Sequence, residues 1–334
     1  MLKAVCKNAT KENAEAILSI RNLKVYFYTY AGVVKAIDGI DLDVYKGETL
    51  GLVGETGCGK SVTASSILRL IDSPGRVVEG EILFKGEDLL KKTEKEMRKI
   101  RGGKIAMVFQ DPATYINPVY TIGNQIAEVI REHQHPNSKD LKQMTVEALK
   151  LVHMPDPERV IDSYPHELST GMRQRAMIAM MLSCRPELLI ADEATTALDV
   201  TVQAQILRLL RDLKEELNLS VIFITHNFGV VAKICERVAV MYAGHIIELG
   251  SKYDIFDSPK HPYTRALLGA IPQLSADPSI ELESIPGTLP NLIYPPSGCR
   301  FHDRCPRKGE KCGSEKPELV EVEAGHYVSC FHFN

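Results

Sequence analysis

A glycine-rich segment, Gly54–Ser61 with the sequence GETGCGKS, contains residue types suited to binding phosphate. It follows an apolar run, Leu50–Val53, that predicts a strand, and it precedes an apolar-periodic segment that predicts a helix. Glycines in such a loop let backbone N–H groups converge on phosphate oxygens, and the following helix N-terminus adds positive charge. The pattern predicts that Lys60 neutralises the β- and γ-phosphates and that Ser61 binds Mg²⁺. The residues expected around the phosphates are Gly54, Glu55, Thr56, Gly57, Cys58, Gly59, Lys60 and Ser61.

Two acidic residues end a second apolar run, Leu188–Ala191. Asp192, at the carboxyl end of this predicted strand, is placed to hold Mg²⁺ or its water beside the phosphate loop. Glu193, one residue further along, is placed to polarise a water that attacks the γ-phosphate. Two acids after a strand are often only solvated loop residues, and the phosphate loop upstream is what favours catalysis here.

Two more predicted strands, Ile105–Phe109 and Val221–Thr225, deliver polar residues at their carboxyl ends in the same way. His226 is expected to hydrogen-bond the γ-phosphate and orient the attacking water. Gln110 is expected to reach Mg²⁺ or that water. Single histidines are usually structural, but placement at a strand end favours a catalytic role in this kind of fold.

Strands and helices must alternate to bring these residues together. The stretches that predict buried strands are Leu50–Val53, Ile105–Phe109, Leu188–Ala191, Val221–Thr225 and Val238–Tyr242. Amphipathic segments lie between them, and residues 202–217 place their apolar side chains on one helical face. The alternation predicts an α/β fold with a mostly parallel sheet and right-handed crossovers. Residues 112–178 are helix-rich and predict an inserted helical subdomain.

Composition divides the 334 residues into three parts. Residues 1–16 are polar and aperiodic, which predicts a mobile leader, and residues 17–250 carry the α/β pattern. Residues 251–334 begin with a proline-punctuated stretch and predict a separate, irregular C-terminal module. No apolar run approaches the roughly 20 residues of a membrane helix, and the first residues lack the core of a signal peptide. With a net charge of −3, the chain has no global basic field that would suggest nucleic-acid binding.

The segment Leu168–Arg175, LSTGMRQR, opens a predicted helix with a serine and a glycine whose free N–H groups suit an anion. It resembles the signature motif of ABC ATPases. Together with the phosphate loop, Gln110, Leu188–Glu193, Ala197–Asp199 and His226, it gives the ordered motif set of that family over about residues 17–250. The resemblance implies a RecA-like P-loop NTPase core with an antiparallel β subdomain and the inserted helical subdomain. It also implies ATP hydrolysis with Mg²⁺, coupled to transport.

In that family the signature of one subunit covers the ATP held by the other, so closure of a dimer drives the cycle. By resemblance, Ser169 and Gly171 bind ATP across the dimer, and Asp199 lies at its seam. One upstream aromatic ring usually stacks on adenine; Tyr26, Phe27, Tyr28 and Tyr30 all offer one, and we favour Tyr30. Two residues depart from the family pattern, since Thr170 replaces a glycine of the signature and Ala194 replaces a proline. We therefore expect ATP binding with slower or partner-dependent hydrolysis.

Three further stretches, Phe109–Gly123, Ser258–Pro272 and Cys299–Pro306, resemble the ATPases of dipeptide and oligopeptide importers. The resemblance implies a peripheral protein on the cytoplasmic face of the membrane. Its partners would be a homologous second ATPase subunit or a second copy of itself, two transmembrane permease subunits and, indirectly, an extracytoplasmic substrate-binding protein. Import of nickel or another small solute is an alternative, because the ATPase does not touch the cargo. A soluble ABC ATPase is disfavoured, because the chain has one cassette and no heptad run.

Four of the eight cysteines crowd the C-terminal part: Cys299, Cys305, Cys312 and Cys330. In a reducing compartment such a cluster predicts metal ligation before disulfides. Four thiolates suit zinc or a [4Fe–4S] cluster, the spacing matches neither standard pattern, and nearby histidines keep zinc open. Reduced structural cysteines are a third possibility. Peptide-importer ATPases with this cysteine set resemble iron–sulfur proteins, which favours a [4Fe–4S] cluster with a structural role.

Overall fold

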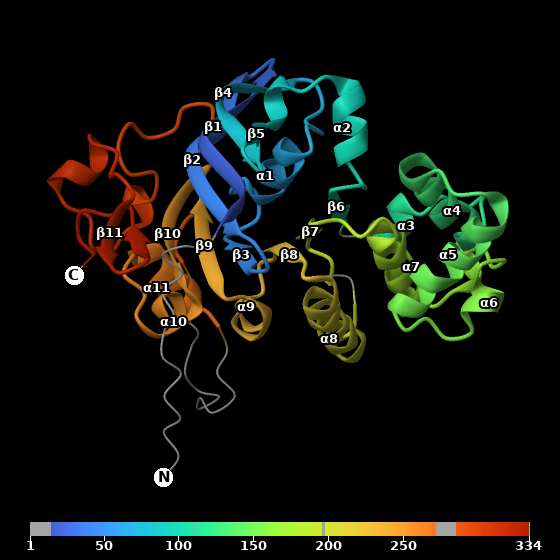
Figure 1. The fold of residues 1–334 in the computed structure, drawn as a ribbon. Helices are drawn as coiled ribbons and strands as arrows, with labels where there is room; N and C mark the ends of the chain where they lie inside the picture. The colour runs from blue at the N-terminus through green and yellow to red at the C-terminus, as the bar shows by residue number, and fades with distance from the viewer. Residues whose placement is uncertain (1–14, 110, 196–197, 272–284, 334) are drawn as a thin grey trace, which may run out of the picture.

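The computed structural model describes residues 15–109, 111–195, 198–271 and 285–333 (Figure 1). Its larger sheet has eight strands, and five neighbouring ones run parallel. In spatial order these are β9 (Arg237–Tyr242), β3 (Thr49–Val53), β8 (Ser220–Ile224), β7 (Leu188–Asp192) and β6 (Ile105–Val108). Every apolar run that predicted a buried strand forms one, and the parallel α/β fold is confirmed.

Three antiparallel strands extend this sheet beyond β9. Strand β10 (His245–Ser251) pairs with β9, and β12 (His326–Val328) pairs with β10 on its other side. Strand β11 (Val320–Glu323) then pairs with β12. The C-terminal part of the chain, which the sequence predicted to be a separate module, thus supplies strands to the main sheet.

A smaller antiparallel sheet covers the phosphate-loop side of the core. Its strands, in spatial order, are β2 (Gly32–Tyr45), β1 (Ala16–Thr29), β4 (Gly75–Phe84) and β5 (Glu87–Asp88). Alternate apolar residues of the β1–β2 hairpin, such as Ile20 and Ile37, join Leu50 and Ile190 of the main sheet in one core. This is the antiparallel subdomain that the family resemblance implied. Residues 1–14, most of the predicted leader, lie outside the described residues.

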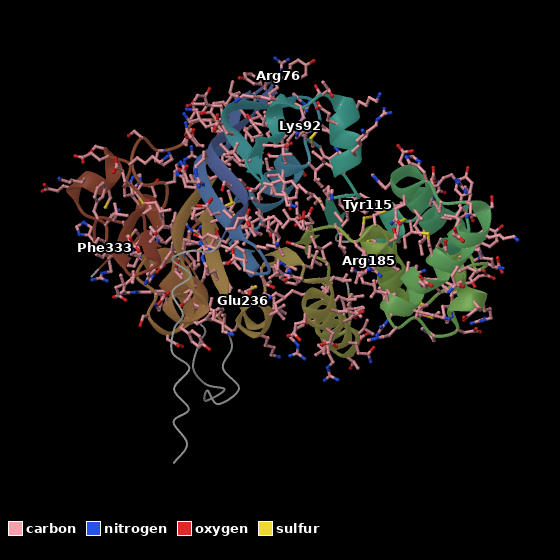
Figure 2. All side chains as sticks on the ribbon, in the orientation of Figure 1. Arg76, Lys92, Tyr115, Arg185, Glu236 and Phe333 are labelled. Carbon is pink, nitrogen blue, oxygen red and sulfur yellow. The ribbon has the colours of Figure 1, made fainter. Side chains whose placement is uncertain are left out.

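The predicted helical subdomain forms a lobe at one end of the molecule (Figure 1). Its helices are α3 (Pro112–Tyr115), α4 (Ile122–Gln134), α5 (Ser138–Leu151), α6 (Pro157–Val160) and α7 (Thr170–Leu182). Helix–helix packing is apolar, with Ile126 and Ile130 of α4 buried in the same cluster as Leu149 of α5. Where the lobe begins, the ring of Tyr115 (labelled in Figure 2) stacks on Phe109 with centroids 3.8 Å apart.

The remaining helices connect strands or flank the sheet. They are α1 (Lys60–Ile67), α2 (Glu94–Ile100), α8 (Val200–Leu217), α9 (Phe228–Ile234), α10 (Lys252–Asp257) and α11 (Pro262–Gly269). Helix α8 buries the apolar face that its periodicity predicted, including Ile206, Leu210 and Leu213. Within the described part of the chain, the structure contains no helix whose length and apolar character would let it span a membrane.

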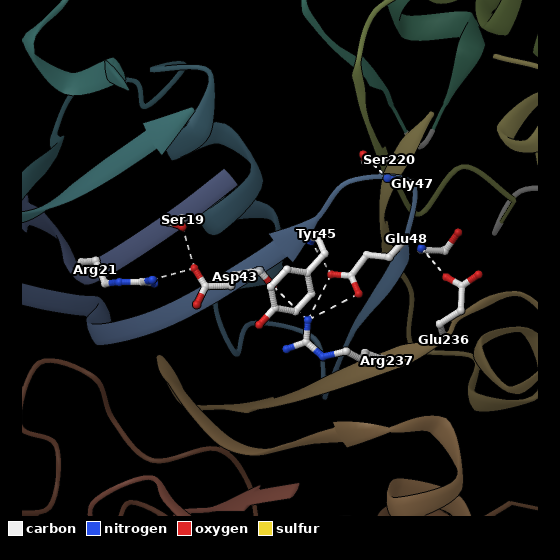
Figure 3. A network of polar contacts seen from close by, with 10 residues as sticks. Ser19, Arg21, Asp43, Tyr45, Gly47, Glu48, Ser220, Glu236 and Arg237 are labelled. Atoms are coloured by element: carbon white, nitrogen blue, oxygen red, sulfur yellow. Dashed lines mark hydrogen bonds and ion pairs between the residues drawn. The ribbon is translucent and has the colours of Figure 1, made fainter. Parts of the chain in front are cut away.

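A polar network fixes the amino ends of the central strands (Figure 3). The guanidinium of Arg237 donates to Glu48 Oε1 at 3.0 Å and lies over the ring of Tyr45, 4.8 Å from its centroid. The N–H of Gly47 donates to the hydroxyl of Ser220 at 2.9 Å. Parallel strands share their carboxyl ends, so this network lies at the end of β3 opposite the phosphate loop.

Candidate nucleotide site

The phosphate loop joins β3 to α1 with a backbone that only glycine tolerates at two points. Gly54 has φ +150°, and a Cβ there would lie 2.1 Å from the carbonyl oxygen of Met241. Gly59 has φ +113°, and a Cβ there would lie 2.9 Å from the carbonyl oxygen of Ala36. Neighbouring strands therefore enclose the loop too closely for larger residues, which fixes its path above the start of α1.

Lys60 and Ser61 are the first residues of α1. The ammonium of Lys60 is buried and donates to the carbonyl oxygens of Gly54 at 2.8 Å and Glu55 at 3.0 Å. The hydroxyl of Ser61 donates to Asp192 Oδ1 at 3.2 Å. Burial raises the pKa of the Asp192 carboxyl, and the Ser61 hydroxyl opposes that shift. A hydroxyl and a carboxylate in contact at a phosphate loop form a donor set that suits Mg²⁺.

Glu193 and His226 face each other from adjacent strand ends. His226 Nδ1 lies 3.4 Å from Glu193 Oε1. Glu193 has φ +49°, in the left-handed region, and its N–H donates to the carbonyl oxygen of Ile224 at 3.0 Å. A non-glycine residue in this region costs about 1–3 kcal/mol, and such residues cluster at active sites. The turn aims the carboxylate away from the β7 axis and toward the strand that carries His226.

The signature segment begins α7 as predicted. Ser169 is the N-cap, and its hydroxyl accepts from the N–H of Met172 at 3.3 Å. A Cβ at Gly171 would lie 3.1 Å from Val202 Cγ1, so close packing against α8 accounts for this glycine. Thr170 is exposed, and its hydroxyl accepts from the Arg173 guanidinium at 3.3 Å.

A contact that the sequence did not predict links this helix to the segment that follows β7. The buried side-chain amide of Gln174 in α7 donates to the carbonyl oxygen of Ala194 at 2.7 Å. Ala194 directly follows Glu193 and is itself buried. The only sequence signal was the position of Gln174 on the inner face of the signature helix.

Asp199, which the sequence placed at a dimer seam, is exposed at the start of α8. It caps the helix by accepting from the N–H groups of Thr201 and Val202, both at 3.0 Å. Gln110 lies outside the described residues, as does Ala197 of the adjoining motif.

The candidate adenine-stacking rings differ in their surroundings. The hydroxyl of Tyr26 donates to Asp38 at 2.7 Å, and Phe27 packs against the core. Tyr28 is partly covered by Arg76, whose guanidinium lies 5.7 Å from the ring centroid. Tyr30, at the tip of the β1–β2 hairpin, is fully exposed. In the described residues no hydrogen bond joins Tyr26, Tyr28 or Tyr30 to the phosphate loop, so the structure does not single out one of these rings.

The loop residue Glu55 is held by two residues from the C-terminal part of the chain, which the sequence did not predict. Its N–H donates to the Tyr263 hydroxyl at 3.0 Å. Its carboxylate accepts from both terminal nitrogens of Arg304, at 2.8 and 2.9 Å. Both contacts span more than 200 residues of sequence.

The four C-terminal cysteines line one small cavity, bounded also by His302 and His332. All four are free thiols. No group of three or more His, Cys, Asp or Glu side chains in the described ranges is arranged to hold a metal ion. The structure therefore gives no support to the predicted metal ligation, by zinc or by an iron–sulfur cluster, in the described residues.

Comparison with known proteins agrees with this geometry. The ABC transporter family model matches residues 37–196, and the model of the oligopeptide/dipeptide transporter C-terminal region matches residues 247–312. The chain is 50% identical to a probable peptide ABC transporter ATP-binding protein of Sinorhizobium fredii, covering 96% of each chain. It is 48% identical to the dipeptide transport ATP-binding protein DppD of Bacillus subtilis, covering 95% of each.

Solved structures share the fold of the catalytic part. A dimeric bacterial ABC transporter cassette aligns with a TM-score of 0.63 and 26% identity, over 70% of this chain and 98% of that one. A component of an ABC transporter complex from Clostridium perfringens aligns with a TM-score of 0.63 and 27% identity, over 73% and 92%. With identity near one half over almost its whole length, the chain belongs to the family of ATP-binding subunits of dipeptide and oligopeptide ABC transporters.

Proposed function

We propose that the chain powers import of dipeptides or oligopeptides by binding and hydrolysing ATP between two cassettes. The observation that carries the catalytic part is the convergence of five residues at the start of α1 and at two strand ends: Lys60, Ser61 with Asp192, and Glu193 with His226. Lys60 neutralises the β- and γ-phosphates, and Ser61 with Asp192 holds Mg²⁺. Glu193 polarises the attacking water while His226 orients it. Gln110, which follows β6, completes the site as a further Mg²⁺ or water ligand.

Dimer closure completes each site in this proposal. The N-cap hydroxyl of Ser169 and the N–H groups of the first turn of α7 cover the γ-phosphate held by the other subunit. Gly171 allows close approach, Asp199 lies at the seam, and Tyr30 stacks on adenine. One structural relative was solved as a dimer in two structures, one of them bound to ADP and phosphate, which supports this arrangement.

The cargo is proposed from the relatives, since the ATPase subunit does not contact it. Proteins named for dipeptide or oligopeptide transport are 45–49% identical to this chain over at least 92% of it. We propose that the second cassette is a homologous subunit or a second copy. The other partners are two permease subunits and, through them, an extracytoplasmic substrate-binding protein, so the subunit works at the cytoplasmic face of the membrane.

An exposed apolar patch at the entrance to the helical lobe supports docking to the permease. Tyr115, Val119 and Tyr120 are 49%, 70% and 55% exposed within six residues of sequence. Exposed aromatic and aliphatic side chains gathered in this way are typical of protein–protein contacts. Tyr115 follows Gln110 by five residues of sequence, so we propose that a permease segment bound to this patch is coupled to the ATP site.

We also propose that the four cysteines hold a [4Fe–4S] cluster. Two of the sulfurs accept a backbone N–H: Cys312 from Gly309 at 3.4 Å and Cys330 from His332 at 3.3 Å. Hydrogen bonds to cysteine sulfur are a recognised means of tuning iron–sulfur clusters. Burial raises the thiol pKa of Cys299 to about 11, so cluster assembly must displace protons.

Transport is tested by reconstituting the subunit with its permease and partner cassette in proteoliposomes. We expect ATP-dependent uptake of a labelled dipeptide or oligopeptide in the presence of the binding protein, abolished by Lys60→Ala. Uptake of nickel but not peptide would overturn the cargo assignment. A subunit that neither associates with membranes nor supports any uptake would overturn the transport role.

The cluster is tested on protein purified without oxygen, by its visible absorbance and by iron, sulfide and zinc analysis. We expect about four iron and four sulfide per chain. Cys305→Ser should lose the absorbance, whereas Cys184→Ser, outside the cavity, should keep it. Iron-free protein with the native fold would remove the cluster from this proposal and leave the ATPase unaffected.

A further inference from the structure

The C-terminal part of the chain reaches back to the phosphate loop through Arg304. The two terminal nitrogens of its guanidinium contact separate carboxylate oxygens of Glu55, at 2.8 and 2.9 Å. This two-bond geometry matches the planar fork of arginine to the carboxylate and fixes both orientation and distance. The side chain of Arg304 is only 7% exposed, so little solvent screens the pair.

Other contacts hold Arg304 independently of Glu55. Its Nε donates to the carbonyl oxygen of Pro286 at 2.8 Å, and one terminal nitrogen lies 3.3 Å from the Tyr242 hydroxyl. The guanidinium also lies over the ring of Phe301, 6.0 Å from its centroid. The short helix His302–Arg304 places Arg304 directly before Cys305 of the four-cysteine cavity. These contacts hold Arg304 in place, so Arg304 can in turn hold the Glu55 carboxylate in position.

The main chain of Glu55 contacts Lys60, so a change in the position of Glu55 would change the phosphate loop. Its main-chain carbonyl accepts from the Lys60 ammonium at 3.0 Å, and its N–H donates to Tyr263. Rotation of the Glu55 peptide would redirect a carbonyl that holds Lys60. A further contact comes from Leu289, whose Cδ1 would lie 3.6 Å from a Cβ at Gly57. Residues 285–305 thus line the outer side of the loop.

We infer that Arg304 is a positioning residue for ATP binding, which acts through Glu55 to hold the phosphate loop in its nucleotide-binding shape. Arg304 does not touch the phosphates. It makes the affinity for ATP depend on the C-terminal part of the chain and on the four-cysteine cavity next to it. This inference rests on the proposed ATP site and adds a control on that site from another part of the fold.

A purely structural role for Arg304 is the competing explanation, and the chain offers a matched control. Arg237 makes a similarly buried pair with Glu48, at 3.0 Å, but at the opposite end of β3 (Figure 3). Removing either arginine should lower thermal stability. Only the loss of Arg304 should change the binding of ATP.

The experiment measures the dissociation constant of Mg·ATP for the intact subunit by fluorescence of a labelled analogue, together with KM and kcat. We expect Arg304→Ala to raise the dissociation constant and KM about tenfold, the effect of losing a hydrogen-bonded charge pair, with kcat within about twofold. Glu55→Gln should do the same, and the double variant should bind no more weakly than the weaker single variant. Arg304→Lys, which keeps the charge but not the fork, should recover part of the affinity and covers the case in which Arg304→Ala fails to fold.

Two results would overturn the inference. One is a folded Arg304→Ala or Arg304→Lys protein whose affinity equals that of the unaltered protein. The other is an Arg237→Ala variant that loses as much affinity as Arg304→Ala for the same loss of thermal stability. Failure of the unaltered protein to bind ATP would instead contradict the proposed function, so the two ideas are tested separately.

Discussion

The side-chain amide of Gln174 donates a 2.7 Å hydrogen bond to the main-chain carbonyl of Ala194, which joins the signature helix to the residue after Glu193. Both residues are buried, so the bond is shielded from water. A displacement of α7 would therefore be transmitted to the residue that follows Glu193, the carboxylate for which we propose a catalytic role.

Replacing Gln174 by methionine tests this link. The change keeps the length of the side chain but leaves the Ala194 carbonyl without its donor, which costs about 1–3 kcal/mol of stability. We expect a lower kcat and an unchanged affinity for ATP, because the phosphate loop is not involved. Urea unfolding and steady-state ATPase assays measure the two effects. Gln143→Met, on the exposed face of α5, is the control; an unaltered kcat in Gln174→Met would show that the bond is not part of the catalytic cycle.

Glu193→Gln should separate ATP binding from hydrolysis. The amide cannot polarise the attacking water, and loss of a general base typically costs 10²–10⁴-fold in rate. We expect phosphate release to fall at least 100-fold while an ATP-bound dimer accumulates, visible by size-exclusion chromatography in Mg·ATP. Glu216→Gln, a change of the same chemistry away from the site on α8, should leave the rate unaltered. Hydrolysis at the normal rate by Glu193→Gln would refute the role assigned to this carboxylate.

The two departures from the family pattern should slow the enzyme. Thr170 places a branched side chain at the exposed start of α7. Ala194 leaves the backbone after Glu193 with more conformational freedom than proline would. We expect the combined change Thr170→Gly and Ala194→Pro to raise the steady-state rate of ATP hydrolysis. Assays with and without the partner subunit would measure it, and a rate that stays the same in both would contradict the expectation.

Acid should destabilise the fold through His245. Burial, with the positive charges of Arg300 and Lys316, lowers the pKa of this imidazole to about 3, although Asp38 opposes the shift. The unfolded chain takes up a proton near pH 6.5 and the folded chain does not, so stability falls as pH drops below 6.5. At pH 5 the loss is about 2 kcal/mol. Urea unfolding at pH 7 and pH 5 measures how much the free energy of unfolding falls with acid. This fall should be smaller in His245→Gln than in the unaltered protein, and an equal fall in both proteins would refute the assignment.

Periodicity and strand ends predicted where Asp192, Glu193 and His226 would lie in the fold. Asp192, Glu193 and His226 each follow an apolar run, and a parallel sheet brings such ends together whatever lies between them in sequence. Glycine spacing predicted the phosphate loop for a similar reason, since the backbone geometry at Gly54 and Gly59 admits no other residue.

The sequence did not predict the contacts between segments that lie far apart along the chain. Arg304 and Tyr263 meet Glu55 across more than 200 residues, and neither lies in a periodic element that would reveal its partner. Strand β12 has three residues, too few for an alternation to be recognised. The cysteine spacing predicted that these residues would gather, but spacing carries no information on how closely their sulfurs approach.

The strand order of the main sheet bears on how the protein is made. Chains fold from the N-terminal part first as the ribosome extends them. Strand β3 is synthesised early, but its neighbours in the sheet, β8 and β9, begin only at Ser220 and Arg237. Strand β10 can pair with β12 only after His326 has left the ribosome. Until then an apolar strand with unpaired backbone groups is open to other chains. We expect nascent chains released between Ser251 and His326 to need a chaperone, which makes the last segment of this fold a checkpoint in its biosynthesis.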